Sequence, residues 1–223
     1  MIIGKGLIAL QFLDCDNDKI IFFASGVSNS SETDKNQFLR EENLIRETLK
    51  AHPHKLFIYF STCSIYDSSK YNSAYVLHKL QMEEIIKEFA THYLILRISN
   101  AVGKGGNPNL LLNYLARSIK DNKVLTIHKN ATRNLIDVED IKNIVLKYIE
   151  SDIHNKIINV AYTDNFKIPD IITAFQDILN IKANISIEDL GEHYSIDVHE
   201  LNYKFPITDK KKYLYNLIKK YYL

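Results

Sequence analysis

The sequence has few of the features that mark specialised classes of protein. It holds only two cysteines, Cys15 and Cys63, in 223 residues, which is too few for a disulfide framework and fits a reducing compartment. The formal net charge of +1 gives no reason to expect a nucleic-acid or membrane partner. No apolar run approaches the roughly 20 residues that cross a bilayer, and the first residues lack the layout of a signal peptide. We therefore expect a cytoplasmic protein that binds neither nucleic acid nor membrane.

Glycine is also scarce, with seven residues in the chain, so a cluster of glycines carries information. The segment 4–9, GKGLIA, fits the pattern G-x-G-x-x-A directly after a short apolar run and before a predicted helix. Glycines at the first two positions permit a tight turn and let backbone N–H groups approach a pyrophosphate. This segment is therefore a candidate dinucleotide loop.

Short apolar runs alternate with amphipathic segments along the chain. The runs are typical of strands covered on both faces, and the segments are typical of helices that bury one face. This alternation predicts an α/β fold with a doubly wound, mostly parallel, Rossmann-like sheet. The predicted strands are 1–3, 19–24, 55–61, 93–98 and 156–161, and the predicted helices are 35–51, 72–90, 109–121, 138–149 and 168–179. Strands become fewer after about residue 105, which predicts a small C-terminal lobe.

The tail 210–223 mixes lysines with aromatic residues. Such a composition also occurs in segments that bind nucleic acid or membranes. The balanced charge of the whole chain instead favours an amphipathic closing helix. Its inward residues would be Leu214, Leu217, Ile218 and Tyr221.

Two groups of polar residues lie where a site is expected. Hydroxyls at Ser61, Thr62 and Ser64 end the third predicted strand, and ligands of open α/β sheets bind beyond the carboxyl ends of strands. Tyr75 and Lys79 follow on the next helix, one turn apart on the same face. A nearby ammonium lowers the pKa of a tyrosine, which would suit it for proton transfer. Taken alone, the first group could cap a helix and the second could be a surface pair.

The motifs together resemble, in order, those of the extended short-chain dehydrogenase/reductase family of nucleotide-sugar epimerases, dehydratases and ketoreductases. The family's patterns are a glycine loop, a strand ending in an Ala/Gly pair, Ser-Ser-x-x-Val-Tyr, Ser-x-Tyr-x-x-x-Lys-x-x-x-Glu, Leu-Arg-x-x-Asn-x-x-Gly, Arg-Asp-Phe-x-x-Val-x-Asp and a late strand that opens Asn-Val. The matching segments here are 4–9, 22–26, 61–66, 73–83, 96–103, 132–141 and 158–160.

The resemblance implies a role for particular residues. NAD or NADP is the implied cofactor, a nucleotide-sugar is the implied substrate, and no metal is implied. The catalytic residues would be Thr62, Tyr75 and Lys79. The cofactor-binding residues would be Gly4, Lys5, Gly6, Leu7, Ile8, Ala24, Ser25, Gly26, Ser61, Tyr75 and Lys79. The substrate-binding residues would be Ser64, Asn100 and Arg133. His52 and His54 flank a proline in a loop, and two such ligands fall short of a metal site.

The chain departs from the family between Gly6 and Lys19, where two further strands are usual and only one short helix fits. Loss of these strands trims one edge and leaves the remaining strands contiguous, and an exposed edge favours a homodimer. The residue that reads the adenosine ribose normally ends the second strand, so the choice between NAD and NADP stays open. A right-handed first connection would move the first helix to the other face of the sheet. We expect a shortened dinucleotide-binding domain at 1–105, joined by segments at about 124–165, and a substrate lobe over the rest of 106–223.

The residues after Thr62 narrow the reaction. The 4,6-dehydratases of the family use an Asp-Glu pair there, whereas this chain has Cys63 and Ser64. The GDP-fucose synthase pattern needs a cysteine directly before the Ile-Tyr pair, and Ser64 stands there. The resemblance therefore favours a 4-ketoreductase of a deoxysugar nucleotide. The alternatives are a nucleotide-sugar 4-epimerase and a non-catalytic binding or scaffold protein.

Overall fold

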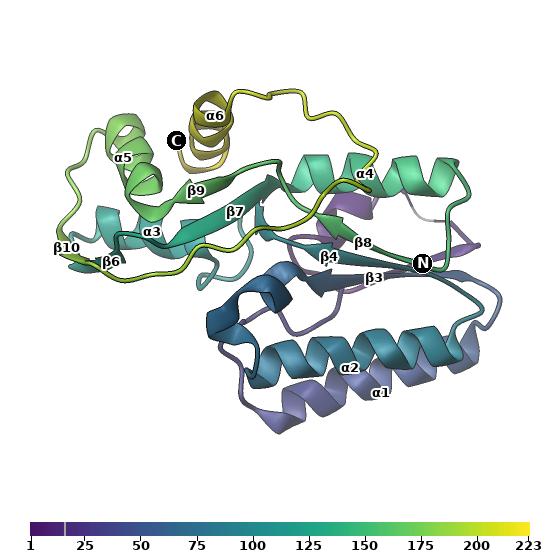
Figure 1. Ribbon diagram of the computed structural model, residues 1–223. Coiled ribbons are helices and arrows are strands. Elements are labelled where there is room, and N and C mark those ends of the chain that lie inside the picture. Colours follow the sequence, from purple (N-terminus) through teal and green to yellow (C-terminus); the bar gives the residue numbers. More distant parts are fainter. Residues whose placement is uncertain (16) are drawn as a thin grey trace.

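A five-stranded parallel sheet forms the centre of the computed structural model, which describes residues 1–15 and 17–223 (Figure 1). Its order is β1-β2-β3-β4-β8, so consecutive strands lie side by side and the sheet is contiguous. Its strands are β1 (Ile2–Ile3), β2 (Ile20–Phe23), β3 (Leu56–Thr62), β4 (His92–Ile98) and β8 (Lys156–Val160). All five coincide with predicted strands, and the predicted doubly wound α/β fold is confirmed.

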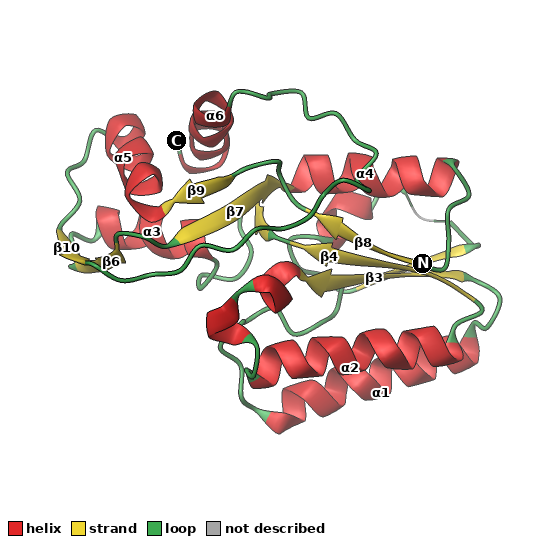
Figure 2. Cartoon of the chain, viewed as in Figure 1, coloured by secondary structure: helices red, strands yellow, loops and turns green. Residues whose placement is uncertain are grey.

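Helices cover both faces of this sheet (Figure 2). One face carries α1 (Lys35–Ala51) and α2 (Ala74–Phe89), and the other carries α4 (Val138–Glu150). Every residue of β2, and all of β3 except Leu56, is buried. Strands with no exposed face need apolar side chains at successive positions, which is why these strands read as continuous apolar runs.

Side-chain caps set the start of the two helices beside the site. The Asp34 carboxylate accepts a hydrogen bond from the Asn36 N–H and begins α1. The Ser73 hydroxyl accepts one from the Val76 N–H at 3.2 Å and begins α2. Such caps satisfy N–H groups that have no partner within the helix. The cap at Ser73 therefore fixes the turn of α2 that follows it, which carries the residues of interest for the site.

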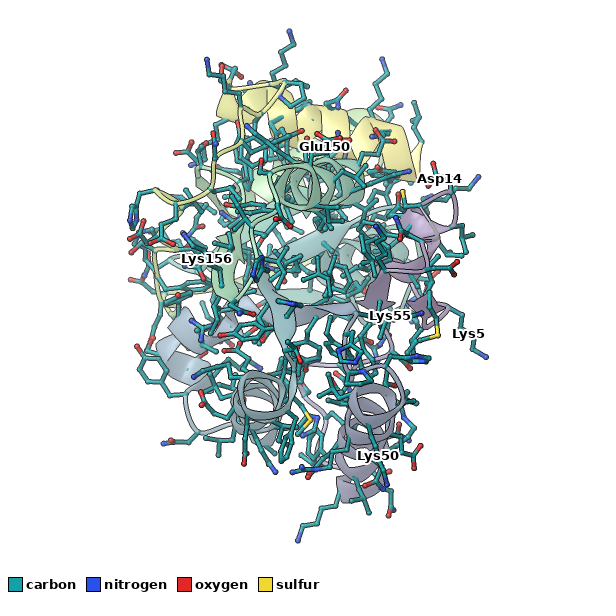
Figure 3. All side chains as sticks on the ribbon, turned by 90° about the vertical axis from the view of Figure 1, so that its right-hand side faces the viewer. Lys5, Asp14, Lys50, Lys55, Glu150 and Lys156 are labelled. Carbon is teal, nitrogen blue, oxygen red and sulfur yellow. The ribbon has the colours of Figure 1, made fainter. Side chains whose placement is uncertain are left out.

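The connection between β1 and β2 differs from the prediction. Where an α-helix was expected, the described part of this connection contains η1, a 3₁₀ helix over Ala9–Phe12. Phe12 stacks on Phe22 at 4.6 Å, and Asp14 forms an ion pair with Lys142 of α4. Figure 3 shows Asp14 on the same side of the sheet as Glu150 of α4, with Lys50 of α1 on the opposite side.

The chain steps in the same direction across the sheet from β1 to β2 and from β2 to β3. The first step passes over the α4 face and the second over the α1 face. The two connections therefore have opposite hands, although crossovers between parallel strands share one hand in nearly all proteins. The first helical element, η1, therefore lies on the face of the sheet that α4 covers, and not on the face that α1 and α2 cover.

The other described residues form two smaller sheets, three further α-helices and the 3₁₀ helices η2 (Cys63–Tyr66) and η3 (Ser68–Lys70). The strands are β5 (Asn100–Val102), β6 (Leu125–His128), β7 (Thr132–Asp137), β9 (Asn165–Lys167) and β10 (Ile185–Glu188), in the orders β5-β7-β9 and β10-β6. The helices are α3 (Leu111–Lys120), α5 (Ile168–Leu179) and α6 (Lys210–Tyr222). Four of these strands lie beyond residue 105, so the expectation that strands become few there was wrong. The sequence analysis did not predict them because none has a run of successive apolar residues. In β6 buried and exposed residues alternate, β9 has three residues and β10 is exposed throughout. The strand β7 is mostly buried, but polar residues interrupt its apolar side chains.

The tail forms the predicted closing helix. Leu214, Leu217 and Ile218 of α6 are buried, and Tyr221 donates a hydrogen bond to Asp137, the capping residue of α4. Lys220 forms an ion pair with the same carboxylate at 2.8 Å. No helix among the described residues has the length and apolar character needed to cross a membrane. The division into two domains near residue 105 stays a prediction.

Candidate functional site

One cavity of about 950 Å³ lies at the carboxyl edge of the five-stranded sheet. Residues that follow β1, β2, β3 and β4 line it, together with side chains from α2, α3 and β7. Every predicted site residue except Gly4 lines this cavity. Gly4 instead lets the loop turn: its φ is +125°, and a Cβ there would collide with the carbonyl of Ala24. The structure thus brings the predicted residues together, while their individual roles stay predictions.

The glycine loop lines the cavity with its backbone. Leu10 and Gln11 donate hydrogen bonds back to the carbonyls of Gly6 and Ile8. Among the described residues, no acceptor is found for the N–H groups of Gly6, Leu7 and Ile8. A Cβ on Gly6 would meet nothing within 4 Å. Successive N–H groups beside open space are the donors that a pyrophosphate requires.

The hydroxyl groups of Thr62 and Ser61, at the end of β3, form hydrogen bonds within the protein. Thr62 Oγ1 accepts a hydrogen bond from the Ser64 N–H at 3.0 Å, which leaves its own O–H free to donate. Ser61 donates to the buried Glu83 carboxylate at 2.5 Å, and Arg97 binds both oxygens of that carboxylate. Cys63 is buried with its thiol on the Arg97 carbonyl, and burial raises its thiol pKa. Cys63 is therefore a buried small side chain directly after β3.

Tyr75 and Lys79 are both buried at the cavity wall, with exposed fractions of 7% and 2%. The Tyr75 ring packs with Val27 and Val76. Its hydroxyl makes no hydrogen bond to any residue that the structure describes. Lys79 Nζ donates hydrogen bonds to Glu41 Oε1 and to the Tyr59 hydroxyl, each at 3.0 Å. The surface-pair interpretation is therefore excluded, and the charge of Lys79 has a buried partner that the sequence prediction did not include.

Glu41 is the residue that the sequence analysis missed. Its side chain is fully buried and faces Lys79, Tyr59, His78 and the backbone N–H of Val27. Burial alone would raise the pKa of this carboxyl, but the Lys79 ammonium and the hydrogen-bond donors hold it well below its usual range. A signal for it does exist in the sequence.

That signal is the position of Glu41 on its helix. The buried stripe of α1 passes through Ile45 and Leu49, and Glu41 continues the same stripe one turn earlier. A carboxylate at a core-facing position requires a buried partner. The amphipathic pattern of 35–51 could therefore have indicated a buried acid, although not which cation would pair with it.

Gly26 offers a test of this packing. A Cβ there would lie 2.5 Å from Lys79 Nζ and 2.7 Å from Glu41 Oε1. We expect Gly26→Ala to lower the free energy of unfolding by about 1–3 kcal/mol and to weaken dinucleotide binding about tenfold, because a held cation must move. Urea denaturation and NADH fluorescence titration measure the two effects. Gly6→Ala is the stability control, and a Gly26→Ala protein as stable as that control would contradict the expectation.

The cavity wall is rich in cations. It carries the side chains of Lys5, Arg40, Lys70, Lys79 and Arg133, against the single carboxylate of Asp67 among its described residues. Such a balance favours an anionic ligand. Figure 3 shows the Lys5 side chain extending outward from the molecule.

The predicted substrate residues Ser64, Asn100 and Arg133 all line the cavity. Asn100 donates to the Asn134 carbonyl at 2.7 Å, and Arg133 Nη2 lies 4.0 Å from Asp67. Tyr194, in an irregular segment with no motif, also lines the cavity. Burial raises the pKa of its hydroxyl to about 12. Arg40, which donates to the Ser25 carbonyl, was also missed because it lies on the polar face of α1. Among the described residues no group of three metal-ligating side chains is arranged for a metal ion.

Comparison with known proteins places this site in a family. The sequence model of the NAD dependent epimerase/dehydratase family matches residues 11–161, more than half of the chain. The chain belongs to this family. The predicted resemblance is thereby confirmed, and the family consists of NAD-dependent enzymes. The matched range begins after the glycine loop, so the role assigned to that loop depends on its position at the cavity.

Solved structures of low sequence identity share the fold. UDP-glucuronic acid 4-epimerase from Bacillus cereus, in complex with NAD, is 19% identical, with a TM-score of 0.73 over 92% of this chain and 71% of the other. UDP-N-acetylglucosamine 4-epimerase from Methanobrevibacter ruminantium is 18% identical, with a TM-score of 0.70 over 90% and 76%. RMD from Pseudomonas aeruginosa, complexed with NADPH, is 17% identical, with a TM-score of 0.68 over 90% and 82%. A comparison with curated protein sequences gave no match.

Proposed function

We propose that the protein is an NAD(P)-dependent nucleotide-sugar oxidoreductase, and specifically a 4-ketoreductase of a deoxysugar nucleotide. The observation that supports this is the convergence of Thr62, Tyr75 and Lys79 with the glycine loop on one cavity. At about 950 Å³ the cavity is near the upper end of the range for small-molecule sites. Its cations and unpartnered N–H groups suit two diphosphate-bearing ligands.

The residues present fit a dinucleotide. The backbone of Gly6, Leu7 and Ile8 would hold its pyrophosphate, and Lys79 would hold the ribose next to the nicotinamide. When bound, the nicotinamide ring supplies or accepts a hydride. Arg133 and Lys70 also line the cavity and would bind the substrate diphosphate. No carboxylate is placed among the described cavity residues near the glycine loop, so NAD and NADP both stay candidates.

The proton chemistry would belong to Tyr75. Its hydroxyl makes no hydrogen bond to any residue that the structure describes, so it is available to donate a proton to the sugar oxygen as a carbonyl is reduced. The free O–H of Thr62 would hydrogen-bond the same oxygen and orient it. The Cys63 and Ser64 side chains offer no acid–base pair that dehydration would need.

A 4-epimerase is the second candidate, because solved structures of similar fold are 4-epimerases. In that reaction Tyr75 would take the proton from the sugar hydroxyl and return it after the keto sugar has turned its other face. Thr62, Tyr75 and Lys79 would serve both reactions. A non-catalytic binding protein is the third candidate, motivated by the trimmed sheet.

One experiment separates the three. NADH and NADPH binding is measured by calorimetry, and the protein is then incubated with UDP-, GDP- and dTDP-sugars and their 4-keto forms. A reductase consumes one reduced cofactor per product, which the absorbance of the cofactor follows. An epimerase gives a new sugar on chromatography without net consumption. Failure to bind either dinucleotide would support the binding protein and refute both enzymes.

A further inference from the structure

A closed set of hydrogen bonds surrounds the Lys79 ammonium at the bottom of the cavity. Lys79 Nζ donates to Glu41 Oε1 and to the Tyr59 hydroxyl, and that hydroxyl donates to Glu41 Oε1 at 2.7 Å. The three side chains come from α2, α1 and β3, and all three are buried. Lys79 also lies 4.9 Å from the centre of the Tyr59 ring, which adds a cation–π contact. These contacts fix the position of the ammonium, and a ligand in the cavity can still reach it.

The second carboxylate oxygen of Glu41 contacts the loop after β2 and a histidine of α2. Glu41 Oε2 accepts a hydrogen bond from the Val27 N–H at 2.6 Å and lies 3.1 Å from His78 Nε2. Val27 belongs to the loop after β2, whose residues Ala24 to Ser30 line the cavity. One carboxylate thus connects this loop to Lys79, and Gly26 leaves the space in which they meet.

We propose that Glu41 is a positioning residue of the active site, which fixes the Lys79 ammonium and offsets its charge before any ligand binds. Lys79 then presents a directed hydrogen-bond donor to the dinucleotide, rather than an uncompensated charge. This inference deepens the proposed function and depends on it for the binding measurement below. The titratable groups around the pair are Tyr59 on β3 and Tyr75, His78 and Glu83 on α2.

The first measurement needs no ligand. Glu41→Gln leaves a buried ammonium without its anion, so we expect the unfolding constant at neutral pH to rise roughly 10²- to 10³-fold. Urea denaturation followed by circular dichroism measures it. The control is Glu42→Gln, the same change on the next residue, whose partner Arg46 is exposed. Equal stability of the two variants would overturn the proposal.

The pH dependence of the free energy of unfolding tests whether Lys79 is the group that Glu41 stabilises. In Glu41→Gln the burial of Lys79 lowers its pKa in the folded state below the unfolded value of about 10.4. The unfolded state then binds more protons between these two values, so the stability of the variant rises with pH in that window. We expect its deficit against wild type to shrink as the pH rises toward about 10. If Glu41→Gln does not fold, the double variant Glu41→Gln/Lys79→Met, which lacks both charges, is expected to recover most of the stability. A double variant that is no more stable would overturn the proposal.

The second measurement distinguishes positioning from mere structural support. The chain contains no tryptophan, so bound NADH fluoresces without tryptophan background. Wild-type affinity for NADH is expected to stay level between about pH 6.5 and about pH 9.5, because the Lys79 ammonium keeps the Glu41 carboxylate as its buried partner. Glu41→Gln is expected to lose affinity as the pH rises, reaching about tenfold at the alkaline end, and Glu41→Asp is expected to restore most of the level profile.

A loss of affinity in Glu41→Gln that is the same at every pH would show a structural role only and would overturn the positioning role. Failure of the wild-type protein to bind NADH or NADPH would instead refute the proposed function. The ligand-free stability measurements would then still decide whether Glu41 holds Lys79.

Discussion

Replacing Tyr75 with phenylalanine is expected to lower turnover by roughly 10²- to 10⁴-fold while leaving dinucleotide affinity nearly unchanged. The ring would keep its packing against Val27 and Val76, since only the hydroxyl is removed. That hydroxyl bonds to no residue that the structure describes, so its loss breaks no native contact there. The variant therefore isolates the proton donor from the fold. Initial rates with the identified substrate and NADH titration measure the two quantities.

The matched control is Tyr71→Phe. Tyr71 precedes the same helix by a few residues and is exposed, so its hydroxyl has no place in the proposed chemistry. We expect this control to turn over at the wild-type rate. Turnover of Tyr75→Phe close to that of the control would remove Tyr75 from its role as acid and base.

Replacing Arg97 with methionine is expected to cost about 3 kcal/mol of the free energy of unfolding. Arg97 binds both oxygens of Glu83 at 3.0 and 2.6 Å, and the Glu83 side chain is 1% exposed. Without the guanidinium, that carboxylate keeps only Ser61 as a partner within the described network. The expected cost stays at the lower end of values for buried pairs, because the Arg97 side chain is itself 20% exposed.

Urea denaturation measures the loss, and Arg46→Met is the control. The Arg46–Glu42 pair spans one turn of α1 with both partners partly exposed, and Arg46 also lies 5.3 Å from the centre of the Phe89 ring. Removal of both contacts should cost no more than about 1 kcal/mol. Equal losses in the two variants would show that Glu83 does not need its partner. Because Ser61 bonds to Glu83, the Arg97→Met protein would also reveal whether this support reaches the cavity wall.

The sequence predicted the central sheet well because its strands have no exposed face. Each residue of β2 is buried, so the run of apolar side chains is unbroken and easily seen. The helices α1 and α5 were predicted with their observed bounds, since a cap or a proline marks each start and the apolar stripe marks the length. The strand β10 was not, because all four of its residues are exposed and no burial pattern marks them.

The candidate site was predictable to the extent that it lies on motifs. Tyr75 and Lys79 occur at the spacing of one helical turn on α2, and Thr62 ends β3, the strand that precedes this helix. Glu41 lies outside any motif, and its contact with Lys79 depends on how α1 and α2 pack against β3, which no local pattern specifies. Tyr194 reaches the cavity from an irregular segment, where spacing carries no information on position.

The unusual hand of the first connection has a consequence for how this sheet can be altered. It is the topology that remains when an internal strand–helix–strand block is cut from a doubly wound sheet and the flanking pieces stay in place. Within the described residues β1 pairs only with β2, so its outer edge is the surface from which such a block would have been removed. The same edge is therefore an acceptor site for a graft: a two-stranded insert placed between η1 and β2 would extend the sheet without displacing α4 or the cavity.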